Sequence, residues 1–501
     1  MIADGAGLHV AFLAVYLLAL IGVGALKARK VKTQEDFSLA GRGLTTWILT
    51  GTLLATWIGT GSIFGTAEEA YKVGTAVWVL PLSSALGIVA LFALAARIRR
   101  FGQFTIQDIL EARFGVAARV LGTITLLLAY VIIVSYQYRA GSAVLEHVVP
   151  GMGHTAAVCA VAAFVILYTA LAGMFSVAYT DVANGLLMVL GLALAIPLLF
   201  AKVGGPAAAL ETLDAEGLHD LGHYSPTLLL SLMLPPLFLI LGDANMVQRF
   251  FSAKDEKSAR RSAAGMFFGV LLLDWMIICV ALLGRALIAQ GKLDVPMRGN
   301  EEAPGQIVVH LAFNALPGFL GAMLVATVVA VVVSTADSYL LSPATSLVRD
   351  VYQRFVKPDA NPAHMVKVGR FTVLALGLVA LGLAFLSKEY FSVALFAYTI
   401  YGAGITPAIL AAYFWKRATL AGAVSSMLTG VSTALVWKWL TVESSQTWAD
   451  GAGLGFLGDL GRWATKSGVE AIIPAIVVSI VVLIVVSLLT PPPDEAHANA
   501  I

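Results

Sequence analysis

Apolar residues fill most of this chain in long stretches, separated by short segments rich in charged and turn-forming residues. Each stretch is close to the length of about 20 apolar residues that one helix needs to cross a bilayer. Thirteen such spans are expected, and they begin near Gly7, Trp47, Thr75, Val116, Thr155, Val177, Pro226, Ala263, Pro317, Val366, Phe391, Leu420 and Val469. The pattern predicts an all-α polytopic membrane protein.

The second and seventh predicted spans depart from the pattern of a straight apolar helix. The second contains the glycine-rich segment ATWIGTGSIFG, and the seventh contains the segment LPPLFLILGDAN. The bilayer tolerates interrupted backbone where it lines a cavity or binds a ligand, although glycine also permits close helix packing. Each of these spans begins a block of five, and a shift of five spans reverses the orientation in the membrane. Paired breaks of this kind favour an inverted repeat with a transport site between its halves.

This division predicts five parts of the chain. Residues 1–46 form a peripheral helix and a cytoplasmic loop, and residues 47–201 form the first five-helix repeat. Residues 202–418 form the second repeat with its outer loops, residues 419–490 form two further peripheral helices, and residues 491–501 form a disordered tail.

Lysine and arginine are concentrated in alternate loops between the predicted spans. The loop after the seventh span is one of them, and it holds Arg249, Lys254 and Arg260. Because cytoplasmic loops carry the excess of basic residues, we expect the N-terminus outside and the C-terminus in the cytoplasm.

Composition agrees with this class and excludes several others. The 501 residues are 59% hydrophobic and 12% charged, whereas soluble domains are about 25% charged. A net charge of +2 does not suit a nucleic-acid binder, and two cysteines within apolar runs make no disulfide framework or zinc cluster. No His-rich or Ser/His pattern indicates an enzyme, and nothing indicates a removable signal peptide or an obligatory protein partner.

Ionisable side chains inside membrane spans are expensive and usually functional. Besides Arg139, the spans contain Asp181, Asp243, Asp274 and Asp337. The ninth span also presents Ser334, Thr335 and Ser338 beside Asp337 within little more than one turn. Such oxygen ligands suit a hard cation, although serine and threonine in membrane helices also bond their own backbone carbonyls.

Six segments along almost the whole chain carry a resemblance to a known family: DFSLAGRGLTTW, ATWIGTGSIFG, YTALAGMFSVAYTDV, QRFFSAKDEKSARRS, STADSYLL and YGAGITPAILAAYFWKR. Their ordered set resembles the sodium:solute symporters, which include bacterial proline, pantothenate, sialic acid and galactose carriers. The resemblance implies a LeuT-type fold, with ten core helices in two inverted five-helix repeats and a broken first helix in each repeat.

The resemblance also implies a first sodium site, formed by the carbonyls of Ala55, Ile58 and Val331 and the hydroxyls of Ser334 and Thr335. Five neutral oxygens would hold a monovalent ion without a carboxylate to lock it in place.

Some family members bind a second sodium ion, at positions that correspond here to Asp181, Ser334, Asp337 and Ser338. This chain has Asp337 where the sialic acid carrier has a serine. Proline-type carriers often have an aspartate at this position too. Two carboxylates near one ion favour a second sodium ion or a proton on one of them. The proline carrier's aspartate in the second span corresponds to Trp57, so that role is absent.

Candidate solute-binding residues flank the two breaks and the fourth span. Arg139 can clamp a carboxylate in a bidentate manner, or it can pair internally with an acid such as Glu68 or Asp243. The full set of candidates is Arg139, Gln137, Glu68, Thr60, Trp78, Asp243, Asn245 and Tyr398. An acid and a base near one cavity indicate a small anionic or zwitterionic solute, with amino acids and carboxylates ahead of sugars. Asp274 has no assigned role.

These expectations describe an inner-membrane symporter that couples one or two Na⁺ ions to a small organic solute by alternating access. Two alternatives stay open. In the first, Asp181 or Asp337 carries a proton and the hydroxyls of the ninth span are structural. In the second, the protein is a transport-like membrane sensor or channel.

Overall fold

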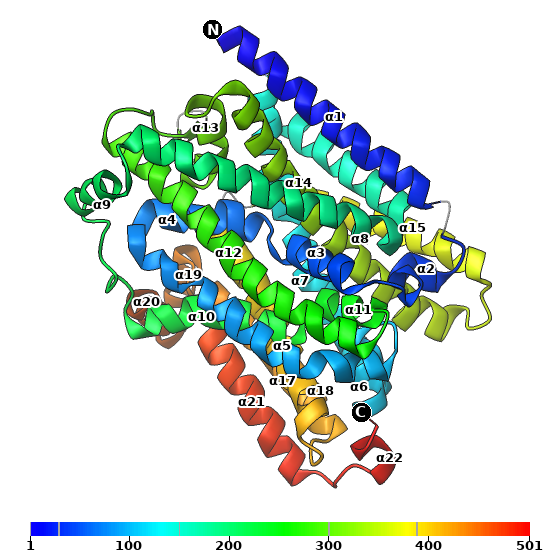
Figure 1. The fold of residues 1–501 in the computed structure, drawn as a ribbon. Helices are drawn as coiled ribbons and strands as arrows, with labels where there is room; N and C mark the ends of the chain where they lie inside the picture. Colours follow the sequence, from blue (N-terminus) through cyan, green and yellow to red (C-terminus); the bar gives the residue numbers. More distant parts are fainter. Residues whose placement is uncertain (1, 29–30, 150, 299–300, 387–388, 501) are drawn as a thin grey trace.

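A computed structural model describes residues 2–28, 31–149, 151–298, 301–386 and 389–500 of the chain. Within them, twelve helices are long and apolar enough to cross a membrane, and a bent helix pair raises the number to 13. The predicted all-α polytopic architecture is therefore confirmed. The N-terminal helix α1 begins at the opposite end of the helical bundle from the C-terminal segment (Figure 1).

The membrane-length segments include both continuous helices and segments built from two or more pieces. The continuous ones are α1 (Ile2–Ala28), α5 (Pro81–Phe101), α7 (Val116–Val148), α12 (Glu256–Ala289), α15 (Pro362–Leu383), α18 (Leu420–Leu440) and α21 (Ile472–Leu489). Helix α8 (His154–Val203) contains two spans that meet at a kink. The first composite segment joins α3 (Thr46–Trp57), the π-helix η2 (Gly61–Thr66), α4 (Ala67–Val73) and the 3₁₀-helix η3 (Gly74–Val79). The second joins α10 (Pro226–Gly242) and α11 (Ala244–Ser252), and the third joins α14 (Gly318–Ser346) and the π-helix η5 (Leu347–Val356). The fourth joins α16 (Phe391–Gly404) and α17 (Thr406–Phe414).

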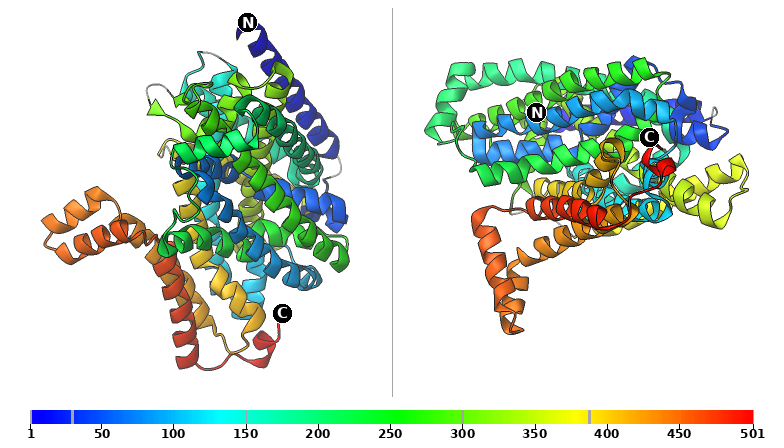
Figure 2. Two further views of the ribbon diagram at one scale, coloured as in Figure 1. Left: turned by 60° about the vertical axis from the view of Figure 1, so that its left-hand side comes forward. Right: turned by 90° about the horizontal axis from the view of Figure 1, so that it is seen from below.

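Shorter elements connect these segments. They are α2 (Gln34–Leu39), η1 (Ala40–Arg42), α6 (Ile106–Phe114), α9 (Pro206–Ala215), β1 (Met297–Arg298), β2 (Glu301–Glu302), η4 (Pro304–Gln306), α13 (Ile307–Asn314), α19 (Glu443–Gly451), α20 (Gly455–Ser467) and α22 (Glu495–Ala498). Helix α22 is one helical turn within the tail that the sequence predicts to be disordered. The hairpin of α19 and α20 projects away from the bundle (Figure 2).

One span boundary differs from the prediction. The third span begins at Pro81 rather than near Thr75, because residues Gly74–Val79 form η3 and complete the second span. The fifth and sixth spans are present as predicted, as His154–Leu171 and Gly173–Val203, and they meet within α8 at a sharp kink at Gly173, whose φ is +59°. A side chain at Gly173 would lie 2.7 Å from Cδ2 of Phe37, so both the backbone angle and the close approach require glycine here.

Helix α14 forms the centre of the bundle. In the most apolar window of the segment Gly318–Val356, 89% of residues are buried, against 22% for the window in α1 at the periphery. Helices α7 and α8 pack directly on α14. An all-round apolar helix such as this one is expected in the interior, so its hydroxyls and Asp337 face protein rather than lipid.

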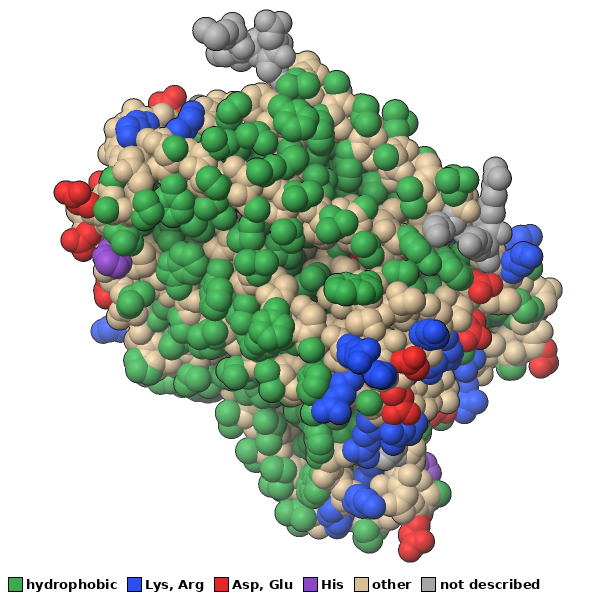
Figure 3. Space-filling model, in the orientation of Figure 1, with side chains coloured by type: hydrophobic (Ala, Val, Ile, Leu, Met, Phe, Trp, Pro, Cys, Tyr) green, Lys and Arg blue, Asp and Glu red, His purple; other side chains and the backbone are tan. Residues whose placement is uncertain are grey.

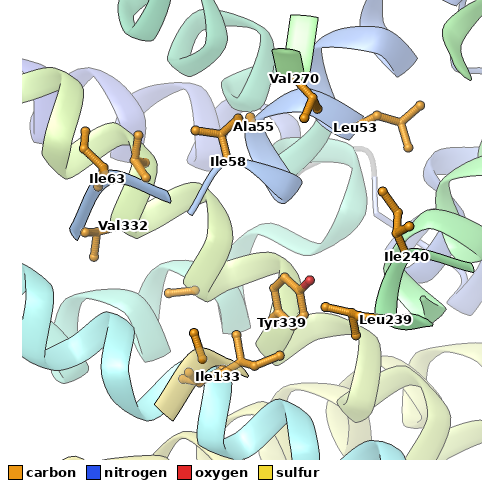
Figure 4. Close-up of a cluster of buried hydrophobic side chains, with 14 of the residues drawn as sticks. Leu53, Ala55, Ile58, Ile63, Ile133, Leu239, Ile240, Val270, Val332 and Tyr339 are labelled. Carbon is orange, nitrogen blue, oxygen red and sulfur yellow. The ribbon is translucent and has the colours of Figure 1, made fainter. Parts of the chain in front are cut away.

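Both predicted breaks are present. Helix α3 ends at Trp57, Ile58 adopts an extended conformation (ψ 99°), and the chain resumes at an angle of 51°. Helix α10 ends at Gly242, and Asp243 is likewise extended (ψ 119°) before α11 begins. Figure 4 shows Ala55, Ile58 and Ile63 along the first break and Val332 on the neighbouring helix. Both interruptions therefore lie inside the protein.

Hydrophobic side chains cover the broad face that α12 crosses, whereas lysines and arginines gather at the α6 end of the bundle (Figure 3). This distribution separates an apolar belt from a basic end.

Candidate ion and solute sites

The first break brings together all five oxygens of the expected first sodium site. Ser334 Oγ lies 2.9 Å from the Ala55 carbonyl and 3.2 Å from the Val331 carbonyl. Thr335 Oγ1 lies 3.4 Å from the Ala55 carbonyl and 3.2 Å from the Ile58 carbonyl. All five residues are buried. Because α3 ends here, the carbonyl of the extended Ile58 points out of the helical ladder and is available to a ligand.

The residues present fit a small monovalent cation. The cluster contains three carbonyls and two hydroxyls, all neutral and all hard donors. A methyl group at Gly59 would lie 2.8 Å from Cγ2 and 2.9 Å from Oγ1 of Thr335. Glycine at this position is therefore what lets the backbone of the break approach α14 closely. The ligand set itself stays a prediction.

A second polar cluster lies one turn along α14 and contains the acids expected at the second sodium site. Asp181 on α8 accepts a 2.5 Å hydrogen bond from Thr52 on α3. Asp337 and Ser338 face the same region from α14, and Thr56 lies 3.2 Å from Ser338 through their hydroxyls. One oxygen of Asp181 and one of Asp337 are buried without a hydrogen-bond partner among the described residues. Two such oxygens fit a cation or a proton.

Arg249 also belongs to this cluster, and its predicted place in a cytoplasmic loop is wrong. The residue lies on α11, fully buried, with its Nη2 2.7 Å from Ser338 Oγ and 3.5 Å from Asp181 Oδ2. Its Nε donates to Thr52 at 3.0 Å. The sequence assignment failed because a short helix resumes after the second break and keeps the chain inside the bundle. The break itself was the signal that could have placed Arg249 there.

A cavity of about 60 Å³ opens beside the first break. Its wall includes Trp57, Ser62, Phe391 and Tyr398, and it also includes Asp274 of α12. Trp57 and Gly61 flank the extended Ile58, so the same break forms the sodium ligands and part of this wall. Of the predicted solute-binding residues, Tyr398 lines the cavity.

Arg139 and Glu68 lie outside the lining of this cavity. The Arg139 guanidinium stacks over the Tyr390 ring, 5.1 Å from its centroid, and Nη1 lies 3.4 Å from the Glu389 carbonyl. Glu68 forms a 2.6 Å ion pair with Lys72. The Tyr390 ring and the Glu68 carboxylate both approach Gly305, so Arg139 and Glu68 lie near the start of α16.

Thr60 and Asp243 follow the two breaks, and Gln137 of α7 contacts Thr60. Thr60 donates a hydrogen bond to the side-chain oxygen of Gln137, whose Nε2 has no partner among the described residues. Asp243 caps α11 by accepting from the Met246 amide at 2.9 Å, and it also accepts from Tyr339 at 3.2 Å. These contacts give Thr60, Gln137 and Asp243 clear structural roles.

Asn245 and Trp78 complete the predicted set. Asn245 is buried at the second break, and neither polar atom of its side chain has a hydrogen-bond partner among the described residues. The Trp78 carbonyl accepts from the Trp275 indole at 3.3 Å. Solute contacts by all of these residues stay predictions.

Comparison with known proteins identifies the family. The family model described as the sodium:solute symporter family matches residues 37–430. The osmoregulated proline transporter OpuE of Bacillus subtilis is 25% identical over 97% of this chain and 95% of its own length. The sodium/proline symporter of Escherichia coli is 27% identical over 85% of this chain and 87% of its own length.

Solved structures agree on the fold. A Na⁺-coupled sialic acid symporter in a substrate-bound, outward-open state matches 97% of this chain and 98% of its own, with a TM-score of 0.80 and 19% identity. Mhp1, a nucleobase-cation-symport-1 family transporter in a closed conformation, matches 94% of this chain and 98% of its own, with a TM-score of 0.61 and 13% identity. The bundle therefore has the LeuT-type fold.

Proposed function

This chain belongs to the sodium:solute symporter family, and we propose that the solute it carries with sodium is a small amino acid or carboxylate. The protein is a multi-pass membrane transporter that couples solute movement to sodium. The named relatives are transporters of proline, which supports a small zwitterionic solute as the first one to test.

One observation carries the proposed coupling: the break at Ile58 contributes to the ion cluster and to the cavity wall at once. A Na⁺ ion held by the Ala55 and Ile58 carbonyls would order the backbone between Trp57 and Gly61, which line the cavity. Ordering by the first ligand lowers the free energy that the second must spend on ordering. By thermodynamic reciprocity, the solute would raise sodium affinity by the same factor.

We further propose that the basic end of the bundle, near α6, faces the cytoplasm of a cell whose inner membrane holds the protein. The N-terminus then lies outside, and the C-terminus lies inside. Each sodium ion that enters is driven by about 2.3 kcal/mol per 100 mV of membrane potential, besides its concentration gradient. Two ions per cycle are favoured because the second cluster has two carboxylate oxygens without partners.

Uptake of radiolabelled L-proline by proteoliposomes tests the proposal. Uptake is measured with external NaCl or choline chloride, with and without an inside-negative potential. We expect accumulation with sodium alone and a steeper accumulation with the potential. Equal uptake in both salts would overturn sodium coupling, whereas sodium-dependent uptake of carboxylates in the absence of proline uptake would overturn the amino-acid assignment.

A proton-coupled mechanism is the second candidate. The buried, unpartnered oxygens of Asp181 and Asp337 favour it, since either carboxylate can hold a proton instead of a sodium ion. In choline chloride, uptake that follows an imposed pH gradient would select this candidate.

A further inference from the structure

Asp274 is the acidic group of the cavity that the proposed coupling leaves without a role. It lies at the middle of α12 and is 5% exposed. Its Oδ1 is buried without a hydrogen-bond partner among the described residues, and the Ser62 side chain interacts with its carboxylate. Within the described part of the chain, no lysine, arginine or histidine forms an ion pair with it. A buried carboxylate without a counter-charge is expensive, so this site favours a ligand that supplies one.

The rest of the cavity wall suits a positively charged nitrogen. Three aromatic residues, Trp57, Phe391 and Tyr398, line the same cavity as Asp274. Aromatic faces attract cations, most strongly where water is excluded. Among the described residues of the cavity wall, none is basic and Asp274 is the one carboxylic acid. When Asp274 is ionised, its negative charge and the aromatic rings therefore select for a cation and against a bare anion.

The size of the cavity sets a limit on the cation. A volume of about 60 Å³ has room for roughly four to six water-sized groups at the 10–15 Å³ that each needs. Tyr398 narrows it further, because its hydroxyl lies 2.7 Å from where a side chain at Gly61 would begin. An ammonium group with the carbons attached to it fits this space.

We propose that Asp274 is the solute-binding residue that pairs with the ammonium group of the transported molecule, with the aromatic rings of the cavity around that group. This inference rests on the proposed symport function and makes it narrower: the solute is an amine-bearing compound, such as a zwitterionic amino acid, rather than a simple carboxylate. Arg139 lies outside the cavity lining, so the positive nitrogen, rather than a carboxylate clamped by this arginine, is the anchor.

Thermal unfolding of the purified protein with three matched probes tests the inference. L-Proline carries an ammonium and a carboxylate, pyrrolidine retains the ammonium, and cyclopentanecarboxylate retains the carboxylate. Each is titrated in NaCl and in choline chloride. We expect proline and pyrrolidine to raise the apparent Tm of the wild type in NaCl, and cyclopentanecarboxylate to leave it unchanged.

Asp274→Asn removes the charge and keeps the shape of the side chain, so it should raise the half-saturating proline concentration at least tenfold. The sodium-induced shift of this variant should persist, which verifies that it is folded. Asp274→Glu retains the charge and should recover part of the affinity. Glu256→Gln removes an exposed acid from the same helix, so it should behave as the wild type.

Three outcomes would overturn the assignment. In the first, cyclopentanecarboxylate raises the apparent Tm of the wild type and neither proline nor pyrrolidine does. In the second, the half-saturating proline concentration of Asp274→Asn lies within twofold of the wild-type value. In the third, neither amine enlarges the rise in apparent Tm that sodium causes. Equal stabilisation by proline in NaCl and in choline chloride would instead count against sodium coupling and leave the role of Asp274 standing. The comparison of the three probes needs no variant and decides whether an ammonium group anchors the solute, and Asp274→Glu tests the residue even if Asp274→Asn fails to fold.

Discussion

Ser334 Oγ donates to the Ala55 carbonyl at 2.9 Å, and this bond joins two helices across 279 residues of sequence. It fastens the end of α3 to the middle of α14 at the first helix break. Because the donor is a hydroxyl and the acceptor is a carbonyl that ends a helix, both oxygens are also suitable cation ligands. If sodium binds here as proposed, it contacts the same carbonyl that ends α3 at the break.

Removing the two hydroxyls of this cluster should weaken sodium binding. We expect Ser334→Ala and Thr335→Ala each to raise the sodium concentration for half-maximal uptake about tenfold, equivalent to ~1.4 kcal/mol. Thr327→Ala is the matched control, since Thr327 lies on the same helix and bonds the Leu187 carbonyl. Sodium titration of uptake in proteoliposomes measures the effect. Unchanged sodium dependence in both site variants would remove this cluster from the transport cycle.

Gly59→Ala tests the close approach of the break to α14. The new methyl group would lie 2.8 Å from Cγ2 of Thr335, so we expect sodium-dependent stabilisation to be lost. Thr335→Ser removes that methyl group and keeps the hydroxyl, so the double variant should regain part of the sodium shift in Tm. Gly382→Ala is the control, because it meets nothing within 4 Å. No rescue by Thr335→Ser would show that the break fails for another reason.

The architecture could be predicted because the bilayer imposes a strong length rule on the sequence. The spans and both breaks follow from apolar stretches and from their Gly and Pro interruptions. The boundaries between neighbouring spans were harder to predict. The apolar residues of η3 complete the second span, although the same residues are also compatible with the start of the third. The convergence of Ala55 with Ser334 needed the family resemblance, since no spacing rule brings residues so distant in sequence together.

The positions of Arg249 and Asp274 in the folded protein could not be predicted from the sequence. Arg249 lies in a segment rich in basic residues, which resembles a loop until the break places it inside the bundle. Asp274 was visible as a lone acid in an apolar helix, but its partners come from separate parts of the chain. The cavity wall draws on the first broken span, α5, α10, α12 and α16. Such a constellation depends on tertiary packing.

Arg119 anchors a group of acids at the basic end of the bundle. It pairs with Asp108, Glu111 and Asp350, the last at 2.8 Å, and it is 6% exposed. Arg119→Ala would leave Asp108 and Asp350 without their shared counter-charge, so we expect a loss of about 3–5 kcal/mol in stability. The measurement is the apparent Tm, together with sodium-independent solute exchange, which should rise if this group closes the cytoplasmic side.

Arg354→Ala is the control for this change, because Arg354 is half exposed and pairs with Glu111 at 2.8 Å. A surface pair contributes about 0–1 kcal/mol, so its Tm should stay near that of the wild type. Similar losses in the two variants would contradict a special role for Arg119.

The charges around Arg249 predict how many sodium ions move with each solute. Asp181, Asp337 and Arg249 are buried together, and two ionised carboxylates with one guanidinium leave a single negative charge. One additional cation neutralises it, so the intact cluster should bind the second sodium ion. Asp181→Asn leaves Asp337 balanced by Arg249, and we therefore expect the coupling ratio to fall by one sodium ion per solute.

A second change to the cluster separates charge from geometry. Asp181→Asn with Arg249→Gln leaves Asp337 alone and restores one unbalanced negative charge, so the double variant should need a cation again. The ratio is measured in proteoliposomes as the membrane potential at which net solute flux is zero under fixed sodium and solute gradients. An unchanged ratio in Asp181→Asn would dismiss the second sodium ion. A lowered ratio in both variants would mean that the Asp181 oxygens themselves, rather than the net charge, hold it.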